Sequence, residues 1–91
     1  MTRLTQNVQI VNKLGLHARA AATLVRVTST FECDIKLTKG SITVDAKSIL
    51  GMMSLAAAQG TWVSFNCDGV DADQAMVAVV KCISEYFGEG E

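Results

Sequence analysis

The residues best suited to chemistry in this 91-residue chain are its single histidine and a nearby arginine, in the segment Gly15-Leu16-His17-Ala18-Arg19. A neutral imidazole offers a nitrogen lone pair that can attack phosphorus or take up a proton. A guanidinium group presents a planar fork of donors that matches the oxygens of a phosphoryl group. The two side chains together indicate phosphoryl transfer. A surface histidine beside a solvated arginine is the alternative that their spacing alone leaves open.

The position of His17 adds to this interpretation, because it immediately precedes a predicted helix over residues 18–30. No Ser, Thr, Asp or Asn stands directly before the helix, so we expect its first backbone N–H groups to be uncapped and to attract an anion. The positive end of the helix dipole favours a neutral imidazole at about pH 7. Gly15 is expected to position the histidine by turning the chain with a positive φ, and Ala18 follows in the first turn.

Strands are predicted where apolar and polar residues alternate. The alternation covers residues 5–12, then 31–37 and 42–46 as a hairpin, and finally 62–67. In the last of these segments, one face would carry Val63, Phe65 and Cys67 toward the core, and the other would carry Trp62, Ser64 and Asn66 toward solvent.

Two further helices are predicted from apolar residues at helical spacing. A short helix covers residues 48–55; Gly51 weakens it and Gly60 closes it. The last helix follows Asp71, which with the glutamine three residues later resembles a capping box, and its apolar stripe extends to Phe87.

The predicted order β-α-β-β-α-β-α indicates the α/β class, as a two-layer open-faced sandwich in a single domain over residues 1–91. The formal net charge is −1 and the basic residues are scattered, which disfavours nucleic acid as a partner. No apolar run is long enough for a membrane span, and we expect a cytoplasmic protein. Cys33, Cys67 and Cys82 are expected to be reduced and buried, without a metal or cofactor.

A resemblance to a known family rests on two segments of the sequence. They read Asn12-Lys13-Leu14-Gly15-Leu16-His17-Ala18-Arg19-Ala20-Ala21 and Ala46-Lys47-Ser48-Ile49-Leu50-Gly51-Met52-Met53-Ser54-Leu55. Both are similar to motifs of the HPr family, the histidine phosphocarriers of the bacterial phosphotransferase system. The resemblance spans essentially the whole chain and implies a four-stranded antiparallel sheet with three helices on one face.

The resemblance also implies a reaction. His17 would be phosphorylated on Nδ1 by enzyme I, with phosphoenolpyruvate as the original donor, and would pass the group to an enzyme IIA while Arg19 steadies the phosphate. Ser48 matches a regulatory serine that HPr kinase/phosphorylase modifies in some bacteria; the alternative for this serine is to cap the short helix. One departure is Ala20, which stands where the family usually has proline and which adds a backbone N–H to the first turn.

A surface that contacts partner proteins is expected beside His17. Its residues would be Leu16, Arg26, Lys47, Ile49, Leu50 and Met53. The short helix cannot bury all its apolar residues, and the alternative to a contact surface is that they form a loosely covered core. For Arg26, the alternative is an ordinary solvated charge.

Two other functions compete with a stoichiometric carrier that is not itself an enzyme. One is a regulatory binding module controlled through Ser48. The other is a small hydrolase or metal-dependent enzyme that uses His17 with Asp45 or Asp68, which the single histidine and the lack of clustered acids disfavour. For the carrier, we expect a monomer, and both a sugar branch and a nitrogen-related branch remain open.

Overall fold

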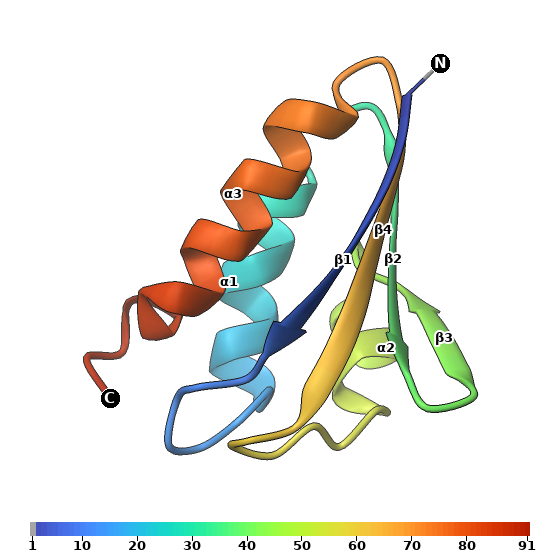
Figure 1. Ribbon diagram of the computed structural model, residues 1–91. Coiled ribbons are helices and arrows are strands. Elements are labelled where there is room, and N and C mark those ends of the chain that lie inside the picture. The colour runs from blue at the N-terminus through green and yellow to red at the C-terminus, as the bar shows by residue number, and fades with distance from the viewer. Residues whose placement is uncertain (1) are drawn as a thin grey trace.

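The computed structural model describes residues 2–91, and Figure 1 shows a single sheet covered on one side by helices. The strands are β1 (Thr2–Gln9), β2 (Asp34–Lys39), β3 (Ile42–Asp45) and β4 (Trp62–Gly69), all antiparallel in the spatial order β1-β4-β2-β3. The helices are α1 (Ala18–Thr28), α2 (Ile49–Met53) and α3 (Ala72–Ser84), and a short 3-10 helix follows at Tyr86–Gly88. The predicted element order and the open-faced antiparallel sandwich are confirmed.

The strand β4 forms the middle of the core, as its alternating sequence predicts. Val63, Phe65 and Cys67 are buried against the helices, whereas Trp62, on the opposite face, is 62% exposed. Burial of each large apolar side chain stabilises the fold by about 1.5 to 3 kcal/mol. The β2 strand buries its own apolar residues beside β4, so the inner face of the sheet is continuous.

The predicted ends of the first strand are wrong. We expected residues 5–12, but β1 begins at Thr2 and ends at Gln9, paired along its whole length with β4. Its early residues are mostly polar and exposed, so backbone pairing at the edge of the sheet, rather than burial, defines this part of the strand. The early end at Gln9 leaves residues 10–17 as the loop that leads to His17.

Two predicted helix boundaries are also corrected. The short helix ends at Met53, and the chain then turns at Ala56, which has a φ of 51°, well before Gly60. The capping box at the start of α3 does not form, because Asp71 has a non-extended backbone and its carboxylate points elsewhere. It accepts hydrogen bonds from the backbone N–H groups of Glu32 at 2.8 Å and Cys33 at 2.9 Å.

The last helix is shorter than predicted, and the residues after it therefore take a different path. It stops at Ser84, and Phe87 lies on the following 3-10 turn, where it is still buried in the core. In Figure 1 the C-terminal end lies at the same end of the molecule as the loop between β1 and α1. The last residues of the chain are thereby close to the start of α1.

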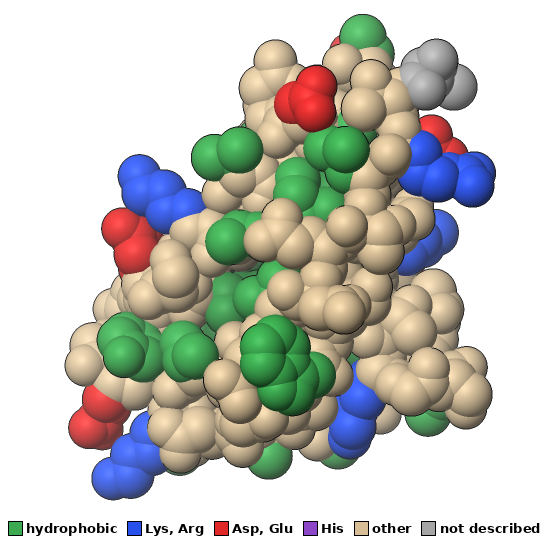
Figure 2. Space-filling model, viewed as in Figure 1, with side chains coloured by type: hydrophobic (Ala, Val, Ile, Leu, Met, Phe, Trp, Pro, Cys, Tyr) green, Lys and Arg blue, Asp and Glu red, His purple; other side chains and the backbone are tan. Residues whose placement is uncertain are grey.

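Charged side chains are mixed on the surface. On the face shown in Figure 2, Lys and Arg lie scattered among Asp and Glu instead of gathering into one basic patch. At one edge Arg3 forms an ion pair of 3.1 Å with Asp68. Within residues 2–91, none of the helices has the length and apolar character needed to cross a bilayer.

Candidate functional site

His17 occupies the N-cap position of α1, at the end of the loop that leaves β1. The turn into the helix needs Gly15, whose φ of 70° lies in the left-handed region that favours glycine. The next residue, Leu16, donates its backbone N–H to the carbonyl of Ala57 at 2.8 Å and so ties the loop to the segment after α2. The expected positioning role of Gly15 therefore fits the backbone geometry.

The two ring nitrogens of His17 have different partners. Nε2 lies 2.5 Å from Oε2 of Glu89, and Nδ1 accepts a longer hydrogen bond of 3.3 Å from the backbone N–H of Arg19. A carboxylate can only accept hydrogen bonds, so Nε2 must carry the proton that lies between it and Glu89. Nδ1 therefore keeps its lone pair, directed toward the start of α1.

This geometry corrects the expectation of an uncapped helix. A neutral imidazole can serve as an N-cap acceptor, and His17 does so for the N–H of Arg19. The N–H groups of Ala18 and Ala20 have no hydrogen-bond partner among the described residues. These two N–H groups, one of which Ala20 has in place of proline, stay open to a hydrogen-bond acceptor at the positive end of the helix.

Glu89 and Asn12 were not predicted as site residues. Asn12 is fully buried, and its Nδ2 donates to Oε1 of Glu89 at 2.9 Å and to the carbonyl of Gly15 at 2.7 Å. Its Oδ1 is buried without a hydrogen-bond partner among residues 2–91, which costs about 1 to 3 kcal/mol. Glu89 is 72 residues from His17, so no local spacing signals the contact.

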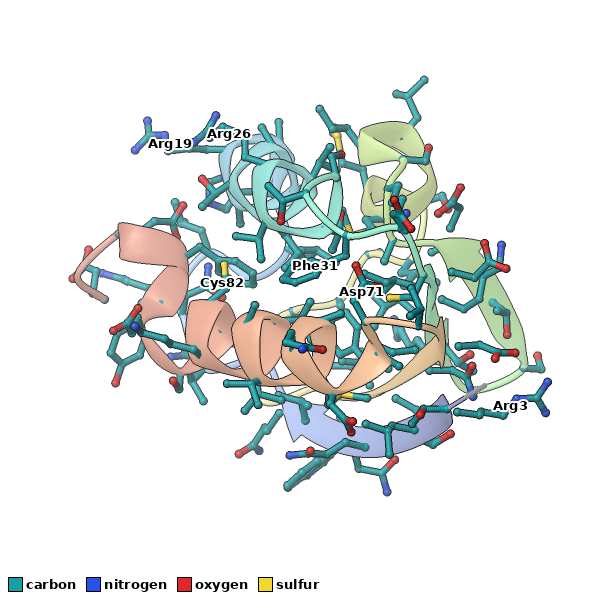
Figure 3. The ribbon with its side chains drawn as sticks, turned by 90° about the horizontal axis from the view of Figure 1, so that it is seen from above. Arg3, Arg19, Arg26, Phe31, Asp71 and Cys82 are labelled. Carbon is teal, nitrogen blue, oxygen red and sulfur yellow. The ribbon has the colours of Figure 1, made fainter. Side chains whose placement is uncertain are left out.

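Two exposed arginines project from the same side of α1, as Figure 3 shows. Arg19 lies in the first turn, next to the histidine, and Arg26 lies in the last turn, where Nη2 donates to Oγ1 of Thr23 at 3.2 Å. Both guanidinium groups are therefore accessible to an anionic ligand or an acidic protein surface.

Exposed apolar side chains lie on the histidine loop and on α2. The most exposed is Leu50, at 80%, on α2; Ile49 and Met53 of α2 and Leu14 of the loop are also exposed. A shallow hollow of roughly 340 Å³ is lined by Leu14, Leu16, His17, Ala18, Met53 and Ala56 to Ala58. We refer to Leu14, Ile49, Leu50 and Met53 as the apolar face; the prediction that part of the α2 segment is exposed is confirmed, whereas Leu14 was missed.

Two residues of the expected partner surface lie differently from the prediction. Leu16 is only 4% exposed and belongs to the core, so it forms the floor of the hollow rather than an open contact. Lys47 is half-buried, and its Nζ donates to the carbonyl of Phe31 at 2.8 Å. Its charge is thus used to hold the loop before β2 instead of extending freely into solvent.

Ser48 is the N-cap of α2. Its Oγ accepts a hydrogen bond of 3.0 Å from the backbone N–H of Gly51, and its backbone is extended, as a cap requires. The capping alternative for this serine is confirmed. The same side chain is half-buried next to the exposed Ile49 and Leu50.

The cysteines lie apart from this surface. Cys33, Cys67 and Cys82 are free and buried, as predicted. Burial, and then the neighbouring Asp71 carboxylate, raise the pKa of the Cys33 thiol to about 11, and burial also raises the pKa of the other two. The neutral thiol is therefore favoured at all three positions.

Comparison with known proteins finds matches that cover nearly the whole chain. The family model described as "PTS HPr component phosphorylation site" matches residues 4–85. The phosphocarrier protein HPr of Neisseria meningitidis is 47% identical over 97% of this chain and 99% of its own length. The phosphocarrier protein NPr of Shewanella violacea is 38% identical over 98% of both chains.

A solved structure matches the fold of this chain. The crystal structure of an HPr from Thermoanaerobacter tengcongensis, 43% identical, covers 98% of both chains with a TM-score of 0.88. The sequence match includes the histidine loop and the α2 segment, and the structural match includes the sheet and its helices. The chain thus belongs to the HPr family, the phosphocarrier proteins of the phosphotransferase system.

Proposed function

We propose that His17 is the residue that carries the phosphoryl group, on Nδ1. The observation that supports this assignment is the lone pair of Nδ1 at the positive end of α1, next to the N–H groups of Ala18 and Ala20. These N–H groups and the Arg19 guanidinium can hold the phosphoryl oxygens without a metal ion. Phosphoryl transfer needs little more than such positioning and charge compensation.

The donor would be the phosphorylated form of enzyme I, supplied by phosphoenolpyruvate, and the acceptor an enzyme IIA. The apolar face and the two arginines of α1 support this part of the proposal, because Leu14 and Met53 line the hollow beside His17 and the arginines project from the same side of α1. Such a surface fits partners with an apolar, acidic surface. The flexible side chain of the exposed Met53 suits a carrier that binds several proteins in turn.

A purely regulatory module that acts through Ser48 is the competing proposal. The intact histidine site, with its partners on both nitrogens, favours the carrier. Regulation can still be added to it: phosphorylation of Ser48 would place about two negative charges beside Ile49 and Leu50 and would weaken the docking of enzyme I.

The test is incubation of the protein with enzyme I, Mg²⁺ and phosphoenolpyruvate, followed by intact-mass measurement. We expect one acid-labile phosphoryl group, absent in His17→Ala. Arg19→Ala should slow its appearance about ten- to hundredfold, since a charged, forked contact to the phosphoryl group is lost. Arg3→Ala, which removes the same charge far from α1, is the control (Figure 3).

The result that would refute the carrier proposal is the absence of any mass gain with an active enzyme I. The branch can be assigned in the same way, because relatives named HPr and NPr both match this chain. The phosphorylated protein is mixed with a sugar-specific or a nitrogen-related enzyme IIA, and the faster transfer identifies the partner.

A further inference from the structure

The carboxylate of Glu89 is largely sheltered from solvent. Its side chain is 10% exposed, and both oxygens have partners: Oε2 contacts Nε2 of His17, and Oε1 accepts from Nδ2 of Asn12. The neighbouring Gly90 and Glu91 are exposed. Removing a carboxylate from water is unfavourable unless the new hydrogen bonds compensate for the lost hydration, so the placement of Glu89 is specific.

The backbone before Glu89 is bent to reach this position. After α3 ends at Ser84, Tyr86 and Phe87 both adopt left-handed conformations, with φ of 57° and 53°. Each residue other than glycine in this conformation costs about 1 to 2 kcal/mol. The buried ring of Phe87 and the hydrogen bond from the N–H of Glu89 to the carbonyl of Tyr86 offset this strain and direct the carboxylate toward the histidine loop.

We propose that Glu89 is a positioning residue for phosphoryl transfer, an inference that rests on the proposed function of His17. Its carboxylate fixes the ring orientation and keeps the proton on Nε2, so that Nδ1 is the nucleophile. Asn12 holds the second carboxylate oxygen and thereby sets the position of the carboxylate itself.

The charge of Glu89 also acts during the transfer. The lone pair of Nδ1 forms the new bond to phosphorus, and the bond between phosphorus and the donor breaks with its electron pair returning to the donor. Nε2 keeps its proton throughout, so the phosphorylated ring bears a positive charge. The carboxylate 2.5 Å from Nε2 offsets that charge and stabilises the phosphorylated state.

A purely structural alternative is that the contact only anchors the end of the chain. The two roles predict different results for Glu89→Gln, which keeps a hydrogen-bond acceptor for Nε2 but removes the charge, and for Glu89→Ala, which removes both. Glu91→Gln is the control for loss of charge, because Glu91 is an exposed carboxylate two residues away with no hydrogen bond to His17.

The first measurement is the NMR signal of the His17 Nε2 proton in the unphosphorylated protein at mildly alkaline pH. Wild type and Glu91→Gln should show a strongly deshielded, slowly exchanging proton. The signal should move upfield in Glu89→Gln and disappear by exchange in Glu89→Ala. An unchanged signal in Glu89→Ala would overturn the proposal.

The second measurement is the phosphorylated fraction at equilibrium with catalytic enzyme I and a fixed ratio of phosphoenolpyruvate to pyruvate. The equilibrium constant does not depend on docking, so a structural anchor leaves it unchanged. We expect a fall of about three- to tenfold in Glu89→Gln and none in Glu91→Gln. An unchanged equilibrium constant in Glu89→Gln refutes the charge role. An increase refutes it too, because it shows that the carboxylate competes with the phosphoryl group.

The two measurements separate this inference from the proposed function. If the wild-type protein takes up no phosphoryl group, the carrier proposal fails, and the Nε2 proton signal alone decides whether Glu89 positions the ring. If the wild type is phosphorylated and the Glu89 variants match it in both measurements, only the inference about Glu89 fails.

Discussion

The carbonyl oxygen of Ala57 occupies the space where a side chain on Gly15 would begin. A Cβ at residue 15 would stand 2.5 Å from that oxygen and 2.9 Å from the Cα of Ala58. The same carbonyl already accepts the N–H of Leu16, so it cannot move away without breaking this bond. The histidine loop and the segment after α2 are thus packed backbone against backbone, and the position of His17 depends on glycine at residue 15.

We therefore expect Gly15→Ala to lower the free energy of unfolding by about 2 to 5 kcal/mol, through left-handed strain and overpacking together. Urea denaturation measures this change. Gly40→Ala is the control, because Gly40 has a similar φ of 61° but open space around it, and it should cost only about 1 to 2 kcal/mol. Equal losses in the two variants would show that the contact with Ala57 contributes nothing.

The cap of α2 gives a second prediction. Ser48→Ala removes the acceptor for the N–H of Gly51 and should lower the free energy of unfolding by about 0.5 to 2 kcal/mol, with little effect on phosphorylation of His17. Ser48→Asp keeps an acceptor and adds a charge, so it should retain stability and weaken enzyme I binding. Calorimetry and titration with enzyme I measure the two effects, and equal affinity of both variants for enzyme I would contradict a docking role for this surface.

The sequence predicts those parts of the fold that depend on neighbours along the chain. The alternation of Val63, Phe65 and Cys67 with polar residues identifies β4, and the glycine before His17 indicates the turn into α1, because side-chain period and backbone freedom are local properties. These signals place the histidine at the start of a helix. The local signals contain no information about which distant side chain contacts Nε2 of the histidine.

The features that the sequence does not predict join residues far apart. Glu89 reaches His17 across 72 positions, and Asp71 accepts from Cys33 across 38 positions instead of capping its own helix. Locally, Glu89 could face solvent and Asp71 could cap the start of α3. Tertiary packing selects the distant partner in both cases. The burial of Leu16 has the same origin, since it depends on the segment after α2 packing over the loop.

The apolar face gives a third prediction, which rests on the proposed docking role. Leu50→Asp should raise the KM for enzyme I about ten- to hundredfold, since burial of a leucine is worth about 1.5 to 3 kcal/mol, with kcat nearly unchanged. Val77→Asp is the control, because Val77 is an exposed apolar residue on a different helix, α3. Steady-state kinetics of phosphorylation distinguish them, and similar KM values for the two variants would place the contact elsewhere.

The carboxylate of Asp71 links stability to pH. Its hydrogen bonds from the N–H of Glu32, and then from that of Cys33, hold the pKa of Asp71 below its usual value of 3.8. A carboxyl group with a lowered folded pKa stabilises the protein at pH values above the unfolded pKa, and this contribution is lost as the pH falls through the folded pKa.

Asp71→Asn should therefore destabilise the protein at about pH 6, and the difference from wild type should shrink as the pH falls through the lowered pKa of Asp71 and the wild-type carboxyl becomes protonated. Thermal unfolding followed by circular dichroism over this range measures the effect. Asp73→Asn, in an exposed position of the first turn of α3, controls for loss of charge near the helix start. A difference between Asp71→Asn and wild type that stays constant over the whole range would show that the carboxylate charge is not what holds the loop before β2.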